Sequence, residues 1–74
     1  MDSSVNILVS VREDCSESEV EEIARQLCSS GMSVVEVMPL VGVVSGRAER
    51  SAMKRLAGIP GVVGVEEDQV FTAY

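Results

Sequence analysis

The chain has 74 residues, of which 46% are apolar and 3% aromatic, so it predicts one small domain with an aliphatic core. Its formal net charge of −6 argues against nucleic-acid binding, which needs a basic surface. Because no run of 18 apolar residues occurs, we expect no membrane span.

The first predicted element is a strand over residues 5–11. Val5, Ile7, Val9 and Val11 alternate with mostly polar residues, and only Leu8 interrupts the pattern. Strict alternation of β-branched residues is typical of a strand with one buried face.

A helix is predicted to follow, beginning at Ser16. Ser16 and Glu19 form the Ser-x-x-Glu pattern of a capping box, and Gly31 is suited to the residue after the helix end. Several glutamates crowd the first turns, and we interpret them as a solvated face that suits the helix dipole, with no metal bound. The apolar stripe of this helix comprises Val20, Ile23, Ala24 and Leu27.

Two strands are predicted next, over residues 34–38 and 40–45, joined at or near Pro39. Proline is poorly tolerated inside a paired strand, which places the connection there. Gly42 would then lie in the second strand, where it would mark a bulge, a close approach of another chain, or packing space for a helix.

A second helix is predicted over residues 47–57 and a fourth strand over residues 62–67. Ala48, Ala52, Met53, Leu56 and Ala57 recur at helical spacing, and Gly58 and Pro60 would end the helix. The resulting order is β-α-β-β-α-β. With right-handed crossovers, this order predicts a ferredoxin-like α+β sandwich, with a four-stranded antiparallel sheet and both helices on one face.

The two cysteines, Cys15 and Cys28, are predicted to be free thiols. Twelve helical rises would separate them by about 18 Å, and a disulfide needs Cα atoms within about 7 Å. We expect Cys28 to act as a small apolar residue on the core side of the helix.

Nothing in the sequence indicates catalysis, a metal site or a cofactor. The chain has no His. The glycines around Pro60 do not form a phosphate-binding loop, because Pro60 and the strand that follows are incompatible with one. The carboxylates of Glu66, Glu67 and Asp68 lack any sign of the pocket that acid–base chemistry needs. By alternation, Glu66 and Asp68 should point to one face of the strand and Glu67 to the other.

The C-terminal run Ile59-Pro-Gly-Val-Val-Gly-Val-Glu-Glu-Asp-Gln-Val-Phe-Thr-Ala-Tyr74 resembles the end of subtilisin propeptides, the I9 inhibitor family. The features of the resemblance are a proline after the second helix, a last strand ending Val-Glu-Glu-Asp and a tail that, in the family, ends at the site of self-cleavage. The resemblance implies an inhibitor domain over residues 1–68 and a protease-binding tail over residues 69–74. If extended, this tail reaches about 20 Å.

The same resemblance implies roles for particular residues. Glu66 and Asp68 would cap the N-termini of two helices on a subtilisin-like serine protease, and Glu67 would face solvent. The tail would lie in the cleft like a product, with Tyr74 in the S1 pocket, Ala73 in S2, Thr72 in S3 and Phe71 in S4. The free protein would be a monomer, and in a precursor it would also act as a folding template.

Alternatives remain at this point. The element order also fits an ACT-like regulatory module that binds a small ligand, although the loop from Glu13 to Ser16 lacks the glycine of such modules. Phe71 and Tyr74 would alternatively fold back over the sheet. Two cysteines and a poorly capped second helix depart from the family pattern. Met1 to Ser4 lack signal-peptide features, so we expect a cytosolic inhibitor or a fragment of a secreted precursor.

Overall fold

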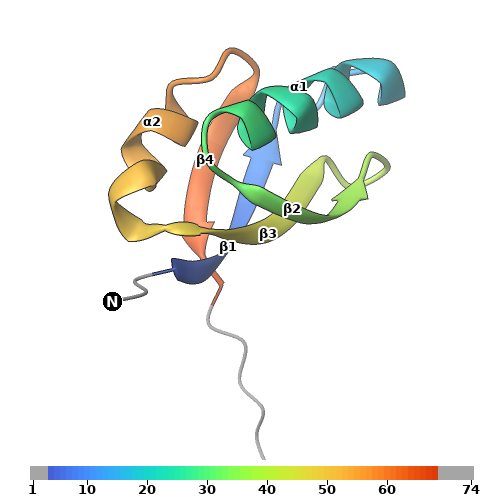
Figure 1. Ribbon diagram of the computed structural model, residues 1–74. Coiled ribbons are helices and arrows are strands. Elements are labelled where there is room, and N and C mark those ends of the chain that lie inside the picture. Colours follow the sequence, from blue (N-terminus) through green and yellow to red (C-terminus); the bar gives the residue numbers. More distant parts are fainter. Residues whose placement is uncertain (1–3, 69–74) are drawn as a thin grey trace, which may run out of the picture.

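The computed structural model describes residues 4–68 and has the predicted order of elements, with one added 3₁₀ turn (Figure 1). The fold is a ferredoxin-like α+β sandwich, which confirms the predicted class. The elements are β1 (Ser4–Val11), α1 (Glu17–Ser29), β2 (Ser33–Met38), β3 (Val43–Glu49), the 3₁₀ turn η1 (Arg50–Ala52), α2 (Met53–Ala57) and β4 (Val62–Glu67).

The four strands form one antiparallel sheet in the order β2-β3-β1-β4. The two helices lie on the same side of this sheet (Figure 1). β1 and β3 are central, whereas β2 and β4 are edge strands with one neighbour each. The other side of the sheet carries no helix in the described part of the chain.

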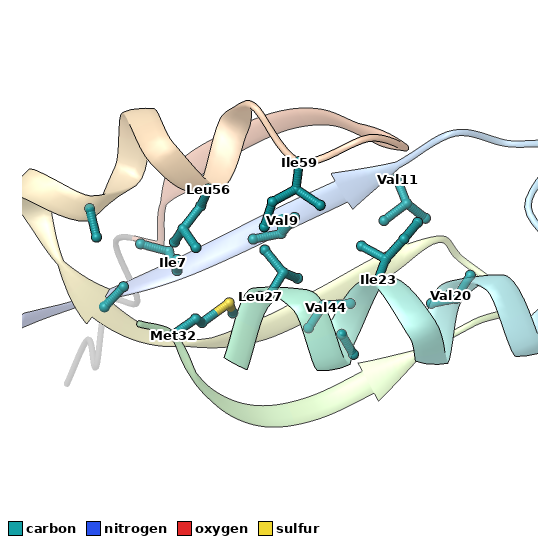
Figure 2. Close-up of a cluster of buried hydrophobic side chains, with 13 residues drawn as sticks. Ile7, Val9, Val11, Val20, Ile23, Leu27, Met32, Val44, Leu56 and Ile59 are labelled. Carbon is teal, nitrogen blue, oxygen red and sulfur yellow. The ribbon is translucent and has the colours of Figure 1, made fainter. Parts of the chain in front are cut away.

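The hydrophobic core lies between the sheet and the helices (Figure 2). Every second residue of β1 enters it, as alternation predicts: Ile7, Val9 and Val11 are buried, whereas Leu8 between them is not. The predicted stripe of α1 is buried as well. Leu56 of α2 and Ile59 after it close the cluster, whose members are aliphatic residues and one methionine.

A complete capping box begins α1. Ser16 Oγ accepts from the Glu19 N–H at 3.2 Å, and Glu19 Oε1 accepts from the Ser16 N–H at 2.7 Å. Hydrogen bonds to the Glu19 carboxylate, first from the Ser16 backbone N–H and then from the Ser16 side chain, lower the pKa of this carboxyl because they favour its charged form. At the other end, Gly31 has a φ of 111° in the position after the cap, as predicted.

Replacing Ser16 with alanine should destabilise the domain by about 1 kcal/mol, because the Glu19 N–H loses its acceptor. In thermal unfolding followed by circular dichroism, this corresponds to a Tm lower by about 5 °C. Ser51→Ala is the control, since Ser51 is exposed and does not cap a helix. Equal Tm values for the two variants would contradict a stabilising role for the cap.

The connection between β2 and β3 differs from the prediction. β3 begins at Val43 rather than at residue 40, and Gly42 belongs to the turn rather than to a strand. Gly42 has a φ of 70°, which favours glycine, and its N–H donates to Met38 O at 3.0 Å. The turn exposes Leu40 and Val41, so the apolar run from Pro39 to Val43 indicated more strand than exists.

The predicted start of the second helix was also wrong. Residues 47–49 extend β3, where Val5 pairs with Ala48 and Ser4 with Glu49, and α2 covers only Met53–Ala57. Ala48 is buried as a residue of β3. In so short a segment its position fits both the spacing of a helix and the alternation of a strand, which is why the helix was predicted too early. No side chain caps η1 or α2, which agrees with the poor helix start noted in the sequence.

Both cysteines are free thiols, but the core role predicted for Cys28 was wrong. Cys28 is exposed on α1, whereas Cys15, before the helix, packs partly against the core. Leu27 beside Cys28 is fully buried and fills the place on the helix that faces the sheet.

Candidate functional site

The side of the sheet opposite the helices carries no helix among residues 4–68 (Figure 1), and we call it the open face. Strand register defines its residues, because each one pairs with a neighbour that points away from the core. They form rows across the strands: Arg47, Asn6 and Asp68; then Glu36, Ser45, Leu8 and Glu66; then Met38, Val43, Ser10 and Gly64.

The end of β4 divides three consecutive carboxylates between the two sides of the sheet. Glu66 is opposite Leu8 on the open face, and Glu67 is opposite the buried Ile7 on the helix side. The Asp68 N–H donates to Asn6 O at 2.7 Å, which continues the ladder and returns Asp68 to the open face. The predicted alternation of these residues is therefore confirmed.

Glu67 is exposed, as expected, and it also has an ion-pair partner on the helix side of the sheet. Its two carboxylate oxygens accept from Arg50 Nη2 at 3.3 and 3.2 Å, across the helix side of the sheet. Its side chain retains 36% of its exposure. Sequence reasoning had no means to find this pair, because its members lie 17 residues apart in different elements.

Glu66 and Asp68 remain without an ion pair among residues 4–68. The nearest cation in their rows is Arg47, but it donates to Asn6 Oδ1 at 3.1 Å and to Ser4 O at 3.3 Å. Two carboxylates on one face of an edge strand therefore keep their accepting capacity for another molecule.

The middle of the open face consists of aliphatic and small side chains that project little from the sheet. Leu8, Met38 and Val43 are half-buried there, next to the small residues Ser10, Ser45 and Gly64. A shallow hollow of about 230 Å³ opens between Val35, Ser45 and Asp68. A surface with aliphatic side chains beside a smooth strip of small residues can accept the ridges of a helix.

Two further hollows of about 210 and 230 Å³ lie at the other end of the sheet, next to Arg12 and Cys15. The Arg12 guanidinium interacts with the Cys15 side chain and with Asp14, and these contacts raise the pKa of Arg12. Within the described chain, no group of three His, Cys, Asp or Glu side chains converges as a metal site would require. No helix among residues 4–68 is long and apolar enough to cross a membrane.

The remaining predicted site residues, Phe71, Thr72, Ala73 and Tyr74, lie outside the described residues. A comparison of the chain with protein-family models and with curated proteins finds no match. We therefore infer the function from the residues themselves and from the geometry of the open face.

Proposed function

We propose that this protein is a substrate-like inhibitor of a subtilisin-type serine protease. One observation carries the proposal: Glu66 and Asp68, which lack ion-pair partners within residues 4–68, share the open face immediately before the tail. A protein that binds through these residues positions its tail on the same partner.

The two carboxylates suit the N-termini of helices on the partner. The first N–H groups of a helix have no acceptor within it, and the helix dipole is positive at that end. A carboxylate supplies charge-assisted hydrogen bonds to such groups. Glu66 near the end of β4 and Asp68 directly after it lie two positions apart on one face, so they can meet two neighbouring helices at once.

The apolar middle of the open face supplies the contact area. Leu8, Met38 and Val43 would pack against the bodies of the same two helices, while Ser10 and Ser45 allow close approach. The sheet would thus become the middle layer of a sandwich, between its own helices and those of the protease.

The tail would complete inhibition by occupying the substrate cleft. An extended segment adds a strand to the binding segments of a protease, and its side chains enter alternate pockets. Tyr74 and Phe71 would anchor S1 and S4, with Thr72 and Ala73 between them. Because the domain would bind the folded protease and not the unfolded chain, it would also favour folding of that protease.

Replacing Glu66 with glutamine and Asp68 with asparagine tests the carboxylate contacts. The double variant should raise the inhibition constant about 10- to 100-fold, since charge-assisted hydrogen bonds contribute more than neutral ones. The measurement is inhibition of peptide hydrolysis by a subtilisin-type protease. The matched control replaces Glu21 and Glu22 of α1 with glutamine, which removes the same charge elsewhere.

Circular dichroism of both variants separates binding from folding. We expect native spectra and Tm values within a few degrees of the unmodified protein. Neither Glu66 nor Asp68 forms an ion pair in the described chain, and the Glu22–Arg25 pair that the control removes is solvent-exposed and contributes little. Loss of folding in the Glu66/Asp68 variant, or an inhibition constant equal to that of the control, would refute the capping contacts.

A further inference from the structure

The end of β4 carries the carboxylates that the proposed function uses, and its register decides which side of the sheet each of them faces. β4 is an edge strand and pairs only with β1. It also changes register by one residue between Ser10 and Val11, so the strand contains a bulge near Val63. Loss of the bulge would shift the pairing of the strand beyond it by one residue. Such a shift moves every side chain beyond the bulge to the opposite face of the sheet.

That shift would alter the proposed binding surface. Without the bulge, Glu67 would lie on the open face, and Glu66 and Asp68 would lie on the helix side. The protein would then present one carboxylate on the open face in place of two. Packing of the half-buried Val65 against the core stabilises the observed register, because a one-residue shift would move Val65 to the open face.

The ion pair between Arg50 and Glu67 also stabilises the observed register. Arg50 lies in η1 directly after β3, on the helix side of the sheet, and both oxygens of Glu67 accept from its Nη2. The register without the bulge would take Glu67 away from that side. Arg50 thus recognises the one carboxylate of three that should not face a partner.

We infer that Arg50 is a positioning residue, which fixes the register of β4 and so selects Glu66 and Asp68 as the carboxylates presented on the open face. This inference rests on the proposed function for its consequence, which is inhibition. Its structural content, the register of the strand end, can be measured without a protease.

A charge swap tests the pair in an inhibition assay. Arg50→Glu and Glu67→Arg should each raise the inhibition constant about fivefold, since each sets like charges against one another, and the double swap should restore the original value. The controls are Arg25→Glu and Glu22→Arg. They carry the same charge changes at an exposed pair on α1, 3.7 Å apart, and should leave inhibition unchanged. Losses that the double swap does not restore, or equal losses in the controls, would overturn the inference.

Amide hydrogen exchange in the free protein gives the second readout. The Asp68 N–H donates to Asn6 O at 2.7 Å in the observed register, so it should exchange slowly. We expect faster exchange of this amide in Arg50→Glu and protection again in the double swap, with the β1–β3 amides unchanged. Unchanged Asp68 protection in Arg50→Glu would overturn the inference. Absence of protease inhibition by the unmodified protein would instead refute the proposed function, and the exchange measurement would still stand.

Discussion

Deleting residues 71–74 is expected to raise the inhibition constant against a subtilisin-type protease at least about 100-fold. Truncation of a single well-packed aromatic anchor costs about 2 kcal/mol or more at protein interfaces, and the deletion removes two such anchors, Phe71 and Tyr74. The measurement compares the intact and shortened proteins in a titration with a chromogenic peptide substrate.

The shortened protein also separates inhibition from other functions of the fold. The sheet and the core that the structure describes are built from residues 4–68, which the deletion leaves intact, so circular dichroism and Tm should be unchanged. Thr72→Ala serves as a control of similar position and small side chain, with an expected effect within about threefold. An ACT-like ligand-binding module would be indifferent to the deletion. Equal inhibition with and without residues 71–74 would contradict the placement of the tail in the cleft.

Replacing Leu27 with alanine is expected to remove about 3 to 5 kcal/mol from the free energy of unfolding. Leu27 is fully buried between α1 and the sheet, so the change leaves a cavity in addition to the lost transfer free energy (Figure 2). A chain of 74 residues has a total stability of about 4 to 11 kcal/mol. The variant should therefore be largely unfolded in moderate urea, where the unmodified protein stays folded.

Leu40→Ala provides the matched control for the core. Leu40 carries the same side chain on the turn between β2 and β3, where its relative exposure is 102%. Its replacement should shift the urea midpoint by less than the equivalent of about 0.5 kcal/mol. A comparable midpoint for the two variants would show that the core does not depend on Leu27 as the structure indicates.

The fold was predictable because most elements carry unambiguous local signals. The alternation of Ile7 and Val9, the capping box at Ser16 and the glycine at position 31 each specify one local structure and agree with one another. The β3–α2 boundary was not predictable in the same way. Ala48 fits a helix by spacing and a strand by pairing, and only the long-range ladder with β1 decides between them.

The candidate site also has one feature that the sequence predicts and others that only tertiary packing determines. That Glu66 and Asp68 share a face follows from the period of a strand alone, so the sequence was sufficient for it. Which face they share depends on the bulge near Val63, and the Arg50–Glu67 pair depends on how η1 lies across β4. Both features come from tertiary packing, which local patterns do not encode.

The central claim is most directly tested by titrating a subtilisin-type protease, whose cleft takes large apolar groups at S1 and S4, with the intact protein. Hydrolysis of a chromogenic peptide would be followed at several substrate concentrations. We predict competitive inhibition with a submicromolar inhibition constant. Full protease activity in the presence of an excess of the protein, shown to be folded by circular dichroism, would contradict the inhibitor function.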